Sequence, residues 1–177
     1  MRKTLIPAIA ALLAAAPLAG AQSANPVTDA LRATVPGAER TLTGAADEMP
    51  ADKYAYSPTK DQMSFGQLVL HVATSNEFLC SKIGGVDAPT EAKLTPTSPK
   101  DQLSARMKRS FEFCSSAFAK LTDAALIDSV PFFGGRKVTK AAAVLDIVGD
   151  WEDHYSQAAG YLRLNGMLPP TAKRGKM

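Results

Sequence analysis

The stretch that decides the fold is residues 139–170, TKAAAVLDIVGDWEDHYSQAAGYLRLNGMLPP. Its apolar positions recur at steps of three and four residues, which places them on one face of an α-helix. They are Val144, Ile147, Trp151, Ala158 and Tyr161. Thr139 suits the cap of such a helix, Asn165-Gly166 its end, and Pro169-Pro170 forbids its continuation. The pattern predicts one long amphipathic helix.

Three further segments upstream have the same helical spacing. The first runs from about residue 27 to residue 49, with Asn25 as a plausible cap and a kink expected at the internal Pro36. The second begins at Ser64, where Gln67 completes a capping-box pattern, and stops at Gly84-Gly85. The third starts after Ser98-Pro99 and reaches residue 121.

The connections between these helices are rich in proline and glycine. They are PADKYAYSPTKDQM (50–63), VDAPTEAKLTPTSP (86–99) and DAALIDSVPFFGGRK (123–137). At about fifteen residues each, such connections are long enough to cross the end or the length of a bundle. Since strand-like alternation is absent, we expect an all-α fold, a four-helix bundle with long crossover connections.

The chain begins with features of a bacterial export signal. Arg2 and Lys3 precede an apolar run from Leu5 to Leu18, and Ala19-Gly20-Ala21 resembles a cleavage site. The run is too short to span a bilayer and no second one follows, so we expect no membrane span. We therefore predict a signal peptide over residues 1–21, a domain over 22–170 and a disordered basic tail over 171–177, in a periplasmic or secreted protein.

The charge of the mature chain is nearly balanced. Without Arg2 and Lys3, 18 basic residues stand against 17 acidic ones. A nucleic-acid-binding protein usually carries a concentrated basic surface, and the only dense basic cluster here is in the tail. We expect no nucleic-acid partner, and we interpret the basic positions of the third helix as solvated surface. They are Arg106, Lys108, Arg109 and Lys120.

The only two histidines, His71 and His154, both fall on apolar stripes. Asp150 lies four residues before His154, so the two side chains lie on one helical face about 6 Å apart. An inward carboxylate without a cation would be costly to desolvate. We therefore expect His71, Asp150 and His154 to hold one divalent metal ion. The alternatives are two unrelated core histidines and an Asp150 that is neutral or paired with a histidine.

The residues around this site resemble those of the DinB superfamily of metalloenzyme-like proteins. The resemblance rests on SFGQLVLHVATSNEFLC (64–80) and on DWEDHYSQAAGYLRLNGMLPP (150–170), and it covers roughly residues 27–170. Members typically have one histidine in the second helix and a His-x-x-x-His pair in the fourth. A Gly-Gln pair follows, and then a Tyr-Leu-Arg-x-x-Gly-x-x-Pro ending.

By position, the resemblance assigns His71 and His154 to two of the family's ligands. The earlier histidine of the pair is replaced here by Asp150, as in the related mycothiol-dependent isomerases, and the glycine of the Gly-Gln pair by Ser156. The resemblance thus implies a metal site of two histidines and one carboxylate. Zinc, nickel and manganese are the candidate ions.

The family's bundle has up-down-down-up order, which makes the second and third helices parallel. Cys80 lies 16 residues after the Ser64 cap, and Cys114 lies 15 residues after Pro99. In parallel helices their heights differ by only about 2 Å. We expect a Cys80–Cys114 disulfide, with a pair of buried free thiols as the alternative.

Two functions are compatible with these features. A metal-dependent hydrolase acting on an unknown small molecule is the better enzyme hypothesis, because the thiol cofactors of the family's transferases and isomerases are cytosolic. No residue is assigned as general base. The alternative is a non-catalytic or stress-associated bundle in which the ion stabilises the fold. A homodimer through exposed helix faces is compatible with both.

Overall fold

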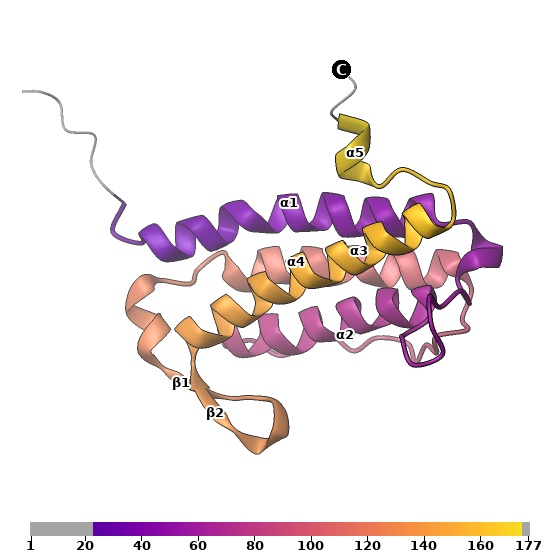
Figure 1. The fold of residues 1–177 in the computed structure, drawn as a ribbon. Helices are drawn as coiled ribbons and strands as arrows, with labels where there is room; N and C mark the ends of the chain where they lie inside the picture. Colours follow the sequence, from indigo (N-terminus) through magenta and orange to yellow (C-terminus); the bar gives the residue numbers. More distant parts are fainter. Residues whose placement is uncertain (1–22, 175–177) are drawn as a thin grey trace, which may run out of the picture.

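The computed structural model describes residues 23–174, and the predicted signal peptide lies outside them. Four long helices form the bundle: α1 (Pro26–Glu48), α2 (Phe65–Gly84), α3 (Lys100–Phe118) and α4 (Lys140–Leu164). Helices α1 and α4 run in one direction, and α2 and α3 run in the other (Figure 1). The predicted all-α bundle is confirmed. Within the described residues, no helix combines the length and the apolar character that a bilayer crossing requires.

The ends of α2 and the start of α4 follow the local signals of the sequence, whereas the predicted Asn25 cap of α1 makes no side-chain capping bond and the Asp123 carboxylate accepts from the Val27 and Thr28 amides instead. Ser64 Oγ accepts a hydrogen bond from the Gln67 amide at 3.2 Å, and Thr139 Oγ1 accepts one from the Ala142 amide at 3.2 Å. Gly85 ends α2 with a φ of 68°, a left-handed conformation that glycine adopts without strain. Helix α1 continues through Pro36 to Glu48.

The core consists of the apolar stripes of all four helices. Its largest fully buried side chains include Trp151, Phe65, Phe111 and Phe118. The segment between α2 and α3 returns along the length of the bundle, so that α3 starts at the same end as α2 (Figure 1). This return makes α2 and α3 parallel neighbours.

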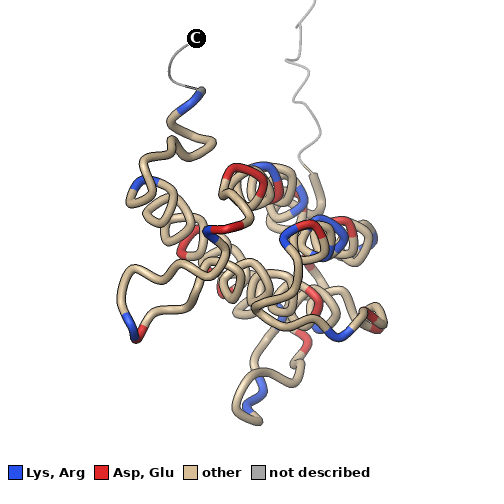
Figure 2. Tube along the Cα trace, turned by 90° about the vertical axis from the view of Figure 1, so that its right-hand side faces the viewer, with Lys and Arg blue, Asp and Glu red and all other residues tan. Residues whose placement is uncertain are grey.

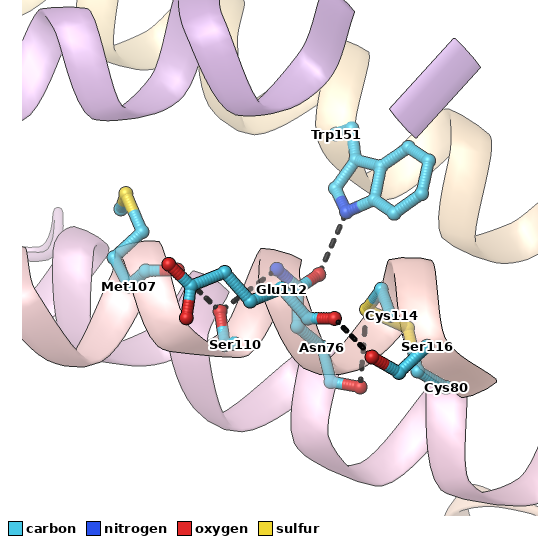
Figure 3. The surroundings of a disulfide bond; sticks show 8 residues. All are labelled: Asn76, Cys80, Met107, Ser110, Glu112, Cys114, Ser116 and Trp151. Carbon is cyan, nitrogen blue, oxygen red and sulfur yellow. Dashed lines mark hydrogen bonds between the residues drawn. A yellow bond between two sulfur atoms is a disulfide. The ribbon is translucent and has the colours of Figure 1, made fainter. Parts of the chain in front are cut away.

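The predicted Cys80–Cys114 disulfide is confirmed, and it joins α2 to α3 with 5.1 Å between the two Cα atoms (Figure 3). Both cysteines are fully buried. The parallel order of the helices brings them to the same height, as the resemblance implied.

A small hairpin in the connection before α4 was not predicted. Strands β1 (Ser129–Pro131) and β2 (Lys137–Thr139) pair antiparallel, and Gly134 and Gly135 make the turn between them with positive φ angles. The expected absence of strands was therefore wrong for this segment. Single-turn 3-10 helices occur at Ala51–Lys53, Asp123–Ile127 and Phe133–Gly135.

The prediction of a disordered tail from residue 171 was wrong for the start of that segment. A short helix, α5 (Pro170–Arg174), lies against α1. The Tyr155 hydroxyl lies 2.7 Å from Thr171 Oγ1, and Lys173 forms an ion pair with Glu48 at 2.5 Å. These contacts from α4 and α1 hold the helix, whereas residues 175–177 lie outside the described part of the chain.

The basic positions expected on the third helix are only partly solvated, and Lys120 lies beyond the end of α3. Lys108, Arg109 and Lys120 are exposed, but Arg106 donates two hydrogen bonds to the Glu77 carboxylate of α2, at 2.9 and 2.7 Å. The side chains of Arg106 and Glu77 are 11% and 10% exposed. The surface interpretation was therefore wrong for Arg106. Elsewhere, basic and acidic positions are interspersed along the helices (Figure 2).

Candidate metal centre

Two antiparallel helices bring the three candidate ligands together. His71 lies in the second turn of α2, and Asp150 and His154 lie one turn apart in α4. The Ser64 and Thr139 caps set where these helices begin. The packing of α2 against α4 then sets the distance between His71 and the two residues of α4. One potential ligand atom from each of the three residues lies within 4.8 Å of the other two.

The imidazole of His154 is held in one orientation. Its Nδ1 lies 2.7 Å from the backbone carbonyl oxygen of Asp150 and 3.4 Å from Asp150 Oδ1. A carbonyl oxygen only accepts, so Nδ1 donates the hydrogen bond and the neutral ring keeps its lone pair on Nε2. Metal-binding histidines are typically fixed in this way.

The Asp150 carboxylate has an unsatisfied oxygen. Oδ2 is buried without a hydrogen-bond partner, and it is the only such side-chain atom found in residues 23–174. Burial raises the pKa of Asp150, while the charges of His154 and His71 act in the opposite direction. Since a buried carboxylate oxygen without a partner is costly, a cation at this position would satisfy it. Two imidazoles and one carboxylate are a donor set that suits a divalent ion.

The two histidines differ in exposure, although the sequence places both on apolar stripes. His154 is buried, with 6% of its surface exposed, whereas His71 is exposed at the edge of α2. Their ring centroids are 4.8 Å apart. Although His71 is exposed overall, partial burial of its ring lowers its pKa and the nearby His154 lowers it further, against the opposing effect of Asp150, so the neutral ring that binds metals is favoured. The site is therefore enclosed on the α4 side and open on the α2 side.

A pocket of about 340 Å³ adjoins the cluster at Asp150. Helix α4 supplies one side of it with Asp146, Gly149 and Asp153, and α2 supplies Leu79. Phe132 and Phe133 of the unpredicted hairpin supply the remaining wall. The sequence analysis missed both phenylalanines as site residues. The signal that could have identified the hairpin is the pair Gly134-Gly135 between two short β-branched segments.

Trp151 belongs to the core and does not cover the cluster. It is 1% exposed, and its Nε1 donates a hydrogen bond to Asn76 Oδ1 at 2.7 Å (Figure 3). Asn76 Nδ2 in turn donates to Ser110 Oγ at 3.0 Å. This buried network links α4, α2 and α3, so it fixes the rotation of α4 that turns the neighbouring Asp150 toward His71. The neighbouring Glu152 and Asp153 are exposed.

The fold is similar to that of three solved bacterial proteins. A DinB-like protein from Bacillus subtilis is 24% identical with a TM-score of 0.64, over 79% of this chain and 95% of its own. A DinB-like protein from Bacillus cereus is 14% identical with a TM-score of 0.66, over 80% and 95%. A conserved protein from Enterococcus faecalis is 18% identical with a TM-score of 0.62, over 76% and 94%.

Sequence comparison gives the same assignment. No curated protein matches the chain. The model of the DinB superfamily, however, matches residues 36–158, which include all three candidate ligands and both cysteines. The expected resemblance is confirmed, and the chain belongs to the DinB superfamily.

Proposed function

We propose that this chain is an exported protein that binds one divalent metal ion through His71, Asp150 and His154. The observation that carries the proposal is the buried, unpartnered Oδ2 of Asp150 beside two imidazoles. No lysine or arginine forms an ion pair with Asp150 in residues 23–174. A divalent cation is therefore the partner that best suits the carboxylate, and zinc, nickel and manganese are the candidates.

We further propose that the site is a small-molecule hydrolase. An ion bound there would supply a Lewis acid and a water of lowered pKa. A substrate could reach the site, because His71 is exposed and a pocket lies beside Asp150. Phe132 and Phe133 form an apolar wall against which a substrate can be oriented. The alternative, a purely structural ion, would suit a site sealed by Trp151, and the indole points to Asn76 instead.

Export of the protein is supported by the disulfide. Disulfides persist in oxidising compartments and are rare in the cytosol, and Cys80 and Cys114 are joined in the core. Together with the signal-like residues 1–21, this favours a periplasmic or secreted location. The family's thiol-dependent reactions rely on cytosolic cofactors, so this location favours hydrolysis over thiol transfer.

Elemental analysis of the purified mature protein tests the metal site. The wild type should contain about one equivalent of metal, and His154→Ala should contain almost none. Asp146→Asn is the matched control, since it changes a carboxylate of the same helix and pocket that is outside the ligand set. Circular dichroism establishes that each variant is folded.

The same samples are then assayed for cleavage of 4-nitrophenyl acetate before and after chelation. Equal metal content in wild type and His154→Ala would overturn the metal site. Full metal content without chelator-sensitive turnover would instead favour the non-catalytic alternative.

A further inference from the structure

A second, larger cavity of about 980 Å³ lies on another side of the bundle. It is built from the C-terminal end of α1, the segment 51–55, the Ser64 cap of α2, the segment 96–99 and the first turns of α3. Helix α4 contributes no residue to it, and it shares none with the metal centre or with the pocket beside Asp150. Its volume is that of a site for a drug-sized molecule.

The interior of this cavity is mainly apolar. Tyr54 lines it together with alanines and prolines from three segments; they are Ala51, Ala55, Pro96, Pro99 and Ala105. Tyr54 is 5% exposed, and its hydroxyl donates to the Ala46 carbonyl at 2.8 Å and lies 3.0 Å from Ser104 Oγ. Burial raises the pKa of Tyr54 to about 12, so the phenol is neutral. Since the Tyr54 hydrogen is used on the Ala46 carbonyl, Ser104 Oγ donates to the Tyr54 hydroxyl and is left as an acceptor in the cavity lining.

The charged residues of the lining are already compensated locally. Lys108 forms an ion pair with Asp47 at 2.9 Å. Lys100 donates to the Asp47 and Met49 carbonyls, both at 2.7 Å, where the negative end of the α1 dipole lies. Asp101 lies in the first turn of α3, where the helix dipole favours an acidic residue. The lining holds two residues of each sign, so a charged ligand would lose its hydration here without an excess of opposite charge to compensate it.

The wall beside α2 is held in place by close packing. A Cβ atom at Gly66 would lie 2.4 Å from the Pro96 carbonyl oxygen, so the 96–99 segment touches the backbone of α2. The Gly66 amide also donates to the Tyr54 carbonyl at 2.8 Å. These contacts pre-form the cavity, and a pre-formed site saves a ligand the entropy of ordering it.

We propose that this cavity binds an uncharged, mainly aromatic or aliphatic small molecule, with one hydroxyl group that donates a hydrogen bond to Ser104. The site is independent of the metal centre.

A matched set of naphthalene probes tests the inference on the intact, metal-loaded protein. Binding of 2-naphthol, 2-naphthoate and 2-naphthylmethylammonium is followed by titration with NMR detection of backbone amides. We expect 2-naphthol to bind at least tenfold more tightly than either charged probe. The shifted amides should be those of Tyr54, Ser104 and Ala105.

Two tryptophan substitutions on α3 locate the site. Ala105→Trp fills the cavity and should weaken 2-naphthol binding by at least tenfold. Ser115→Trp, exposed on the same helix and outside the cavity, should leave it unchanged. Ala55→Trp, in the connection after α1, is used if Ala105→Trp does not fold. His154→Ala should bind 2-naphthol like the wild type, which separates this inference from the metal proposal.

Four results would each overturn the inference. The first is equal affinity for the charged probes, and the second is unchanged 2-naphthol binding in the cavity-filling variant. The third is a set of shifted amides centred on His71, and the fourth is an absence of any 2-naphthol binding.

Discussion

The behaviour of single residues in this bundle depends on which neighbours compensate their polar atoms. Arg106 and Glu77 satisfy each other between α2 and α3. Asp150 differs, because burial raises its pKa and one of its oxygens has no partner. The residue that is least satisfied is thus the one that departs from the three-histidine pattern of the family. We interpret the unpartnered oxygen of Asp150 as an oxygen that is positioned to bind a metal ion.

In metal-free protein, the raised pKa of Asp150 should affect how stability depends on pH. A carboxyl whose pKa is raised by folding binds its proton more tightly in the folded state. Its contribution is therefore present below the unfolded pKa, about 3.9 for Asp, and is lost as the pH rises through the folded pKa. As the pH rises from the unfolded pKa to the folded pKa of Asp150, the chelated wild type should lose stability relative to Asp150→Asn. Urea unfolding at each pH measures this difference.

Comparison with the variant isolates Asp150 from carboxyls whose pKa is lowered, such as Glu91 beside Arg109. Those groups give the opposite trend in both proteins. Parallel curves for wild type and Asp150→Asn would contradict the prediction. Metal added to the wild type should remove the loss of stability.

At the scale of elements, the disulfide and the buried polar network both tie α2 to its neighbours. Cys80–Cys114 joins α2 to α3, and one turn earlier Asn76 joins α2 to Trp151 of α4 and to Ser110 of α3 (Figure 3). Helix α2 is therefore the element that positions α3 and α4. The same contacts hold α2 and α4, which carry the three candidate metal ligands, next to each other.

Removal of the disulfide should destabilise the protein substantially. The bond closes a loop with a sequence separation of 34 residues, for which chain-entropy arguments give about 3–4 kcal/mol. The double variant Cys80→Ala/Cys114→Ala avoids leaving one unpaired thiol in the core. Its free energy of unfolding, measured with guanidinium chloride, should fall by about that amount.

The matched control is the wild type, unfolded with and without reductant. Mass spectrometry without reductant should give a mature mass two hydrogens below that of the dithiol. A fully reduced mass, or identical unfolding curves for the double variant and the oxidised wild type, would contradict the prediction.

At the scale of the whole molecule, the two candidate sites lie on different helix pairs. The metal centre joins α2 and α4, and the apolar cavity joins the C-terminal end of α1 to the start of α3. Ion binding therefore crosslinks parts of the bundle that the disulfide does not join. A ligand that binds only the folded state raises stability by mass action.

Metal should therefore raise the melting temperature. At a free ion concentration one hundred times the Kd, the gain is about 2.7 kcal/mol, or about 5–10 °C for a chain of this size. Calorimetry with zinc, nickel and manganese in parallel ranks the ions. His71→Ala should lose the shift and Asp146→Asn should keep it, whereas an equal shift in both variants would assign the ion to another place.

The sequence by itself determined the helices, because their signals are local. The caps at Ser64 and Thr139, the stop at Gly85 and the three-and-four spacing of α4 depend on neighbours within a few residues. The same is true of the i, i+4 pair of Asp150 and His154. The disulfide needed one further piece of information, the parallel order of α2 and α3, which the resemblance supplied.

Only the tertiary structure decided what lies between the helices. The exposure of His71, the pairing of Arg106 with Glu77 and the contribution of Phe133 to the pocket depend on how far each helix is rotated and on which connection folds over it. Helical periodicity gives a face to each residue, but a residue at the edge of a face becomes buried or exposed only when its neighbour is in place. The apolar cavity also depends on tertiary structure, since its walls come from five segments that no local pattern connects.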